Sequence, residues 1–158
     1  MTFEEICAKA MKDWMPDLDK TGNPYKTYCN LGVDQITTDY VGYSGFKGMM
    51  ANQIFDFMTT PKGRLYWRRI DGLEAFTYAM LKRLCIAVLK LPEHGHIAVI
   101  HPEPLFFSPS WMKKVPSVAN IGKWNKVKPI SYAFPTEPQY YLYDPIPVPD
   151  ASGKTATA

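Results

Sequence analysis

The stretch Cys85-Ile-Ala-Val-Leu-Lys-Leu-Pro-Glu-His-Gly-His-Ile-Ala-Val-Ile100 decides the fold, because the hydrophobic pattern of the chain changes there from helical to extended. Residues 85–89 and 96–100 are short runs rich in β-branched residues, and a Pro-Glu-His-Gly turn separates them. This arrangement predicts a β-hairpin. Both faces of the second run are apolar, so we expect an interior strand that begins at His96.

The segments before this hairpin carry apolar residues at helical spacing. They predict four helices, over residues 3–14, 28–40, 49–58 and 72–83. The motifs Thr2-x-x-Glu5 and Asp71-x-x-Glu74 have the spacing of capping boxes for the first and the fourth helix. In the fourth helix, the residues expected to face the core are Leu73, Phe76, Met80 and Leu84. Residues 16–26, with two prolines, predict a loop.

The second half of the chain has the character of a meandering sheet. Residues 102–118 hold four prolines and predict an irregular excursion, and two more strands are expected at 129–134 and 139–143. Since helices come first and an antiparallel sheet follows, we expect an α+β fold in a single domain over residues 1–144. The composition of residues 145–158, rich in Pro and then in Ala, Ser and Thr, predicts a disordered tail.

Composition and charge exclude several classes of protein. Hydrophobic residues make up 46% of the 158 residues and aromatic residues 14%, so the chain is not of the disordered class. The net charge is +3 with mostly scattered basic residues, whereas nucleic-acid binding needs a clustered basic stripe. No run approaches the ~20 apolar residues of a membrane span. We therefore expect neither a nucleic-acid partner nor a membrane span.

The same inspection bears on targeting and cofactors. The N-terminus, Met-Thr-Phe-Glu-Glu-Ile, is acidic where a secretory signal would be basic, so we expect synthesis in the cytoplasm without a signal peptide. Three cysteines at irregular spacing do not indicate a disulfide framework. The pair His94-Gly-His96 lacks further ligands at zinc spacing. We expect no metal and no other cofactor.

Cys29 is the first candidate for chemistry. With Thr27 as the predicted N-cap, Cys29 falls at the second position of its helix. Free backbone N–H groups and the positive end of the helix dipole favour a thiolate there and can form an oxyanion hole. The alternative is a small buried core residue, which is what most free cysteines are. Cys7 and Cys85 fit that alternative better, because each lies inside an apolar stripe.

His96 is the candidate general base. It shares a strand face with Ala98, whose small side chain leaves room for a neighbour. His94 falls in the turn and His101 on the opposite strand face, and a purely structural role for His96 stays open. A base needs an orienting partner on its second ring nitrogen. Asn120 is the first choice for that role, with Asn125 and Ser117 as alternatives.

Several segments together resemble one superfamily. They are Tyr28-Cys-Asn-Leu-Gly-Val-Asp34, Met50-Ala-Asn-Gln-Ile-Phe-Asp56, Gly95-His-Ile-Ala-Val-Ile100, Val115-Pro-Ser-Val-Ala-Asn-Ile-Gly122 and Ile130-Ser-Tyr-Ala-Phe134. Over about residues 25–143 the chain is similar to the NlpC/P60 and CHAP superfamily of papain-like cysteine peptidases and amidases that cut peptidoglycan. The resemblance implies N-terminal helices packed on an antiparallel sheet. It also implies Cys29 as nucleophile, His96 as base and Asn120 as third residue, the CHAP-like arrangement.

The resemblance further implies a peptidoglycan amidase or endopeptidase, as a phage lysin or as an antibacterial effector with a cognate immunity protein. Either would act on the cell wall after release or injection. Tyr28 and Trp111 are the expected aromatic residues of the substrate groove. Gly32 and the Pro-rich insert 102–115 depart from the family pattern and leave the specificity open. The alternatives are a non-catalytic wall-binding or interaction module on the same fold and a cysteine peptidase that cuts proteins.

Overall fold

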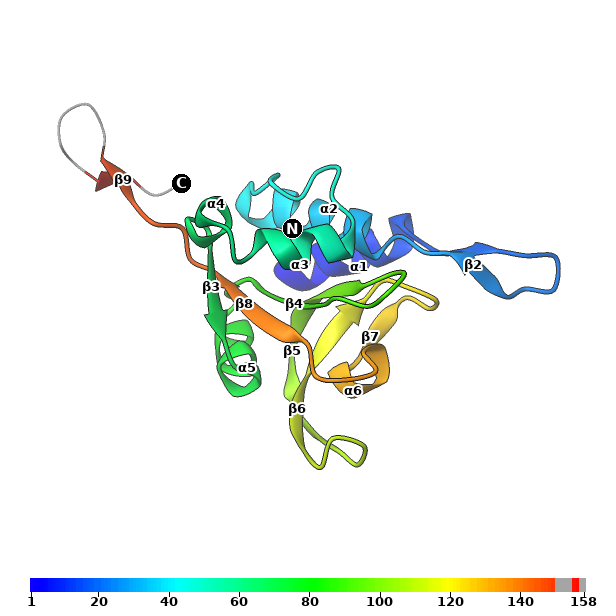
Figure 1. Ribbon diagram of the computed structural model, residues 1–158. Coiled ribbons are helices and arrows are strands. Elements are labelled where there is room, and N and C mark those ends of the chain that lie inside the picture. The colour runs from blue at the N-terminus through cyan, green and yellow to red at the C-terminus, as the bar shows by residue number, and fades with distance from the viewer. Residues whose placement is uncertain (150–154, 157–158) are drawn as a thin grey trace.

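The computed structural model describes residues 1–149 and 155–156 and has an α+β fold (Figure 1). The helices of the described residues are α1 (Phe3–Asp13), α2 (Cys29–Val41), α3 (Ala51–Phe57), α4 (Pro61–Arg64), α5 (Gly72–Met80) and α6 (Ile130–Ala133). The strands are β1 (Asp17–Leu18), β2 (Pro24–Lys26), β3 (Trp67–Ile70), β4 (Cys85–Leu89), β5 (His96–Ser108), β6 (Lys113–Asn120), β7 (Lys126–Pro129), β8 (Gln139–Tyr143), β9 (Val148–Pro149) and β10 (Thr155–Ala156).

Six strands form one antiparallel sheet in the order β3-β8-β4-β5-β6-β7. Helices α1, α2 and α3 lie on one face of this sheet, and α5 and α6 lie on the other (Figure 1). The predicted combination of helices with an antiparallel sheet is therefore confirmed. The second helical layer was not expected, since the sequence predicted helices packed on the sheet without assigning them to two faces.

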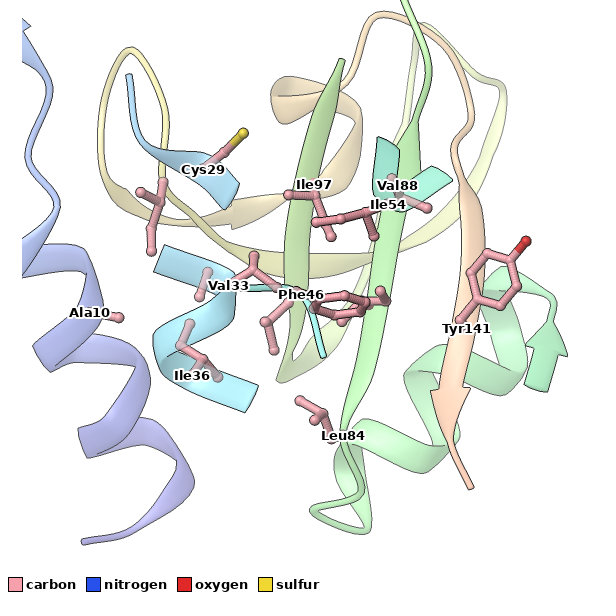
Figure 2. Close-up of a cluster of buried hydrophobic side chains, with 14 of the residues drawn as sticks. Ala10, Cys29, Val33, Ile36, Phe46, Ile54, Leu84, Val88, Ile97 and Tyr141 are labelled. Atoms are coloured by element: carbon pink, nitrogen blue, oxygen red, sulfur yellow. The ribbon is translucent and has the colours of Figure 1, made fainter. Parts of the chain in front are cut away.

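Each face of the sheet buries its own apolar cluster. The α2-side cluster, part of which Figure 2 shows, includes Phe3, Ile6, Cys29, Val33, Ile36, Phe46, Ile54, Ile97 and Val99. The α5-side cluster includes Ile70, Ala75, Ala79, Ala98, Ile100, Val118, Ile130, Phe134 and Leu142. Strand β5 supplies alternate residues to both clusters, and residues 97–100 are fully buried. The predicted hairpin and the interior position of its second strand are confirmed.

The segment 102–118 differs from the expected irregular excursion. Strand β5 continues to Ser108, and β6 returns from Lys113, so the two form one long hairpin that projects from the sheet (Figure 1). The register shifts between His101 and Phe106. Pro102, Pro104 and Pro116 fall within or beside this irregularity, where a missing N–H donor interrupts no regular ladder. The prolines therefore mark a bulge and do not end the strands.

The residues expected to face the core from the fourth helix are only partly right: Leu84 is buried and Phe76 is half-buried. Helix α5 presents Ala75 and Ala79 to the sheet, whereas Leu73 and Met80 are exposed. Small alanines allow the helix to pack close to the sheet, so size decided the buried face more than hydrophobicity did. The capping box at Asp71 is confirmed, with its carboxylate accepting from the Glu74 N–H at 2.8 Å.

The predicted strand 129–134 is also wrong beyond its first residue. Pro129 ends β7, and the next four residues form the short helix α6. Ile130 and Phe134 are four residues apart and both face the α5-side cluster, which suits a helical turn better than a strand. The expected loop 16–26 contains the small hairpin of β1 and β2.

The chain after β8 continues past the sheet. The Asp144 N–H donates to the Tyr66 carbonyl oxygen and the Ile146 N–H to that of Leu65, each at 2.8 Å. Strand β9 then pairs with β10. The predicted disordered tail began at residue 145, and its residues 150–154 and 157–158 lie outside the described part of the chain.

Helix α2 approaches the end of β6 closely because residue 32 is glycine. A Cβ at Gly32 would overlap Cδ1 of Ile121 and lie 3.1 Å from its Cγ2. Ile121 is buried and belongs to the α2-side cluster. Gly32 therefore permits a close approach between helix α2 and the side chain of Ile121.

We predict that Gly32→Ala lowers the free energy of unfolding by about 1 kcal/mol. Overpacking costs about 1–3 kcal/mol and outweighs the roughly 1 kcal/mol that alanine gains in helix propensity. Urea unfolding measures the change. In an Ile121→Val background, which removes Cδ1, the same substitution is expected to be neutral or stabilising. An equal loss in both backgrounds would contradict the packing explanation.

Candidate functional site

Helix α2 places Cys29 at the end of the sheet where β5 begins. Cys29 is the first residue of the helix, and its side chain is 9% exposed at the border of the α2-side cluster (Figure 2). The residue before it, Tyr28, is the N-cap and makes no side-chain capping bond, so the predicted cap at Thr27 is wrong. Cys29 is therefore one position nearer the helix end than the sequence indicated.

The electrostatic environment of the Cys29 thiol differs from the expected one. The backbone N–H groups of Cys29, Asn30 and Ile97 reach the thiol, and each lowers its pKa. Burial acts in the opposite direction and dominates, so the pKa of Cys29 is raised above that of a free thiol. The N–H groups act in the expected direction, but burial outweighs them and favours a neutral Cys29 thiol over the expected thiolate.

His96 and Asn120 form the pair that the sequence proposed. The Nε2 of His96 lies 2.7 Å from Oδ1 of Asn120, and Nδ2 of Asn120 donates to the Trp124 carbonyl oxygen at 2.8 Å. The second bond fixes which end of the amide faces the ring, because only the Nδ2 end can donate. Nε2 must then carry the ring proton. In neutral His96 the basic nitrogen is then Nδ1.

The charge state of His96 also suits a base. Burial lowers the pKa of His96, and the hydrogen bond that its Nε2–H donates to Asn120 only partly opposes this effect. The ring packs against Phe134, with 4.8 Å between ring centroids. His96 is therefore neutral at pH 7 and able to accept a proton.

Cys29 and His96 approach the start of β5 from its two sides. Cys29 belongs to the α2-side cluster, whereas His96 packs on Phe134 of the α5-side cluster. The thiol is near the N–H of Ile97, the residue that follows His96, so the two groups are neighbours along the strand. Among the described residues, no hydrogen bond joins the Cys29 thiol to the His96 ring. The arrangement is a candidate nucleophile beside a candidate base, not a formed ion pair.

Both groups line a cleft at this end of the molecule. One cavity of about 440 Å³ contains Cys29, and a second of about 840 Å³ contains His96 and Asn120. The residues that line both cavities are Tyr25, Thr27, Glu93, His94 and Gly95. The two cavities thus adjoin across β2 and the β4–β5 turn, with the candidate nucleophile on one side and the candidate base on the other.

The β4–β5 turn is fixed in place beside this cleft. Nδ2 of Asn52 donates to the Leu91 carbonyl oxygen at 2.7 Å, and Oδ1 of Asn52 accepts from the Leu91 N–H at 3.2 Å. A Cβ at Gly95 would overlap Oδ1 of Asn52 and lie 2.6 Å from the Leu89 carbonyl oxygen. Only glycine fits there, so helix α3 holds the turn that leads into His96.

The two predicted groove residues lie elsewhere. Tyr28 donates to Oδ2 of Asp17 at 2.6 Å and packs on Trp14, and it lines neither cavity. Trp111 is at the tip of the β5–β6 hairpin, where its N–H donates to Oγ of Ser108. The structure therefore gives no support to Tyr28 or Trp111 as groove residues.

The aromatic residues that do line the cleft were missed. They are Tyr25 in β2, Trp124 after β6 and Tyr132 in α6. Only their nearness in the folded chain identifies them, because their three segments are far apart in sequence. Exposed His94 lines both cavities, and buried His101 pairs with Glu103 at 3.1 Å, outside the cleft.

The other two cysteines are poor candidates for a nucleophile. Cys7 and Cys85 are fully buried, and burial raises the pKa of each thiol to about 12. Within residues 1–149, 155 and 156, His, Cys, Asp and Glu side chains form no group of three that is able to hold a metal ion. In the same part of the chain, no helix has the length and apolar character needed to cross a membrane.

Comparison with known proteins gives no assignment: the sequence matches no known family model, and no curated protein is significantly similar to it.

We predict that Cys29 is the first cysteine to react with iodoacetamide, at a rate that rises about tenfold per pH unit through pH 9. The raised pKa keeps the thiolate fraction small at neutral pH, and Cys7 and Cys85 are enclosed. Peptide mass spectrometry across a pH series measures the site and rate. The rapid alkylation should be absent from the Cys29→Ala protein. A rate that is already at its plateau by pH 7 would show that burial does not control this thiol.

Proposed function

We propose that this protein is a cysteine hydrolase that cuts an amide bond of peptidoglycan, with a papain-like core of the NlpC/P60 and CHAP type. The observation that carries the proposal is the His96–Asn120 pair at 2.7 Å beside the thiol at the start of α2. Thiol-based acyl transfer requires a cysteine, a histidine base and a third group that orients the histidine. Here a helix presents the cysteine, a strand bears the histidine, and an amide side chain orients the histidine ring.

The geometry suggests a sequence of steps. Nδ1 of His96 takes the proton of the Cys29 thiol, and the sulfur attacks the amide carbonyl carbon. Backbone N–H groups at the start of α2 then stabilise the oxyanion, because the first N–H groups of a helix have no partner within it. His96 returns the proton to the leaving amine, and water hydrolyses the thioester with His96 again as base.

The resting charge states favour general-base activation over a preformed thiolate–imidazolium pair. The pKa of Cys29 is raised and that of His96 is lowered, so both groups are neutral before substrate binds. The hydrogen bond between nucleophile and base often forms only in the substrate complex. We expect the hydrogen bond between the Cys29 thiol and the His96 ring to form when substrate enters the cleft between the two cavities. The substrate class, peptidoglycan, rests on the resemblance in sequence, and so does action on the wall after release or injection.

Substitution tests the catalytic assignment. We expect Cys29→Ala to abolish digestion of purified peptidoglycan, and His96→Ala to slow it about 10²–10⁴-fold, the usual contribution of a general base. Asn120→Ala should slow digestion less than His96→Ala does, because Asn120 orients the His96 ring and does not itself react. Release of muropeptides, followed by mass spectrometry, is the measurement.

Cys7→Ala is the matched control, since it removes a thiol outside the cleft. Denatured casein, digested in parallel, distinguishes a wall hydrolase from a peptidase that acts on proteins. Undiminished wall digestion by Cys29→Ala would refute the proposal.

The pH profile gives an independent test. His96 must be neutral to act as base, and its pKa lies below the ordinary 6.5, so the acid limb of kcat/KM should have its midpoint below pH 6.5. The hydrogen bond to Asn120 raises the pKa of His96. Asn120→Ala should therefore move the acid limb to still lower pH. An acid limb at or above pH 6.5, or a shift in the other direction, would contradict this assignment.

The second candidate is a non-catalytic wall-binding or interaction module on the same fold. The nearly enclosed thiol and the lack of a hydrogen bond from Cys29 to His96 in the described residues favour it. Such a module would sediment with insoluble peptidoglycan equally well as wild type and as Cys29→Ala, and would release no soluble fragments.

A further inference from the structure

The cleft has an aromatic wall on the His96 side that the proposed chemistry does not use. Trp124 and Tyr132 both line the 840 Å³ cavity that holds His96 and Asn120. Their side chains are 37% and 59% exposed, although large aromatic residues are usually covered. Two exposed rings beside a candidate active site present flat apolar surfaces to whatever enters the cleft.

The Trp124 ring contacts the ammonium group of a lysine. Nζ of Lys128 lies 2.8 Å from the centroid of the Trp124 ring and 5.9 Å from that of Tyr132, and Lys128 does not line the cavity. The backbone is fixed, because the Trp124 carbonyl oxygen accepts from Asn120. The wall is thus built before any ligand arrives, which lowers the entropic cost of binding.

The turn that carries Trp124 is anchored to α1. Nδ2 of Asn125 donates to the carbonyl oxygens of Met11 and Trp14 at 2.8 and 2.9 Å, and its Oδ1 accepts from the Gly122 N–H at 2.9 Å. The aromatic wall and the candidate base therefore share one rigid support. A ligand that stacks on Trp124 is positioned relative to His96.

The chemistry of this wall fits a saccharide ring. One face of a pyranose exposes C–H groups that pack on an aromatic ring, while its hydroxyl and amide groups remain free for hydrogen bonds. Polar partners are available on the same cavity lining, in Glu93 and Lys123. A purely apolar ligand would leave these two charged groups desolvated at a cost.

We propose that Trp124 and Tyr132 form a glycan subsite, so that the protein acts on stem peptides still attached to their glycan strand and discriminates against free stem peptides. This inference rests on the proposed function for its substrate. The subsite itself is a binding surface, however, and it can be tested without turnover.

The binding test uses the Cys29→Ala protein and a tetramer of N-acetylglucosamine as probe. The Trp124 indole N–H signal is expected to shift on titration, and Trp124→Ala should weaken binding about tenfold, the size of effect that one aromatic contact supplies. Tyr132→Ala, at a more exposed position, should weaken binding without a risk to folding. Phe107→Ala, an exposed aromatic residue on β5 outside the cleft, is the control and should bind as before.

The turnover test compares a glycan-bearing muropeptide with the same stem peptide lacking sugar. Trp124→Ala should raise KM about tenfold for the first substrate only, and Trp124→Phe should restore most of the loss. An unshifted Trp124 signal, or equal effects of Trp124→Ala on both substrates, would overturn the glycan subsite and leave the hydrolase proposal standing. If wild type cuts neither substrate, the hydrolase proposal fails, and the binding test still decides the subsite.

Discussion

The burial of strand β5 on both faces is the constraint on which the rest of this structure depends. Ile97 and Val99 face one helical layer, while Ala98 and Ile100 face the other, and all four are fully buried. A strand buried on both faces has a fixed register, since a slip of one residue would exchange the two sets. That register fixes His96 on the α5 side, where Phe134 and Asn120 hold its ring. It also brings the Ile97 N–H to the Cys29 thiol on the α2 side.

The site shows how burial and hydrogen bonding compete for the same ionisable groups. The helix end and the backbone N–H groups stabilise a thiolate, yet desolvation of Cys29 is the larger effect. Desolvation also lowers the pKa of His96, and the hydrogen bond that His96 donates to Asn120 only partly opposes it. Burial at this end of the sheet therefore favours the neutral form of both groups. This state suits a thiol that is deprotonated only as it attacks, and it protects the thiol from adventitious oxidation, which proceeds through the thiolate.

The aromatic wall of the cleft is built from the same contacts that orient the base. Asn120 bonds the His96 ring with one end of its amide and the Trp124 backbone with the other. Asn125 ties the following turn to the end of α1. A single short segment after β6 thus connects the candidate base, the candidate ligand surface and the helical layer. This connection explains how a surface aromatic residue can be held rigidly at the mouth of a cleft.

The sequence by itself determined the elements that depend on local patterns. The capping box at Asp71, the β4–β5 hairpin and the central position of β5 were predictable, because each depends on spacing along the chain or on strand alternation. For the partner of His96 the sequence offered Asn120, Asn125 and Ser117, and the fold selected Asn120. Tertiary structure alone decided the rest. Close packing of α5 buried Ala75 and Ala79 in place of larger residues, and the bulge after His101 accommodated the prolines within one long hairpin. The charge of Cys29 and the aromatic lining of the cleft also required the fold, because desolvation and nearness in space are set by residues distant in sequence.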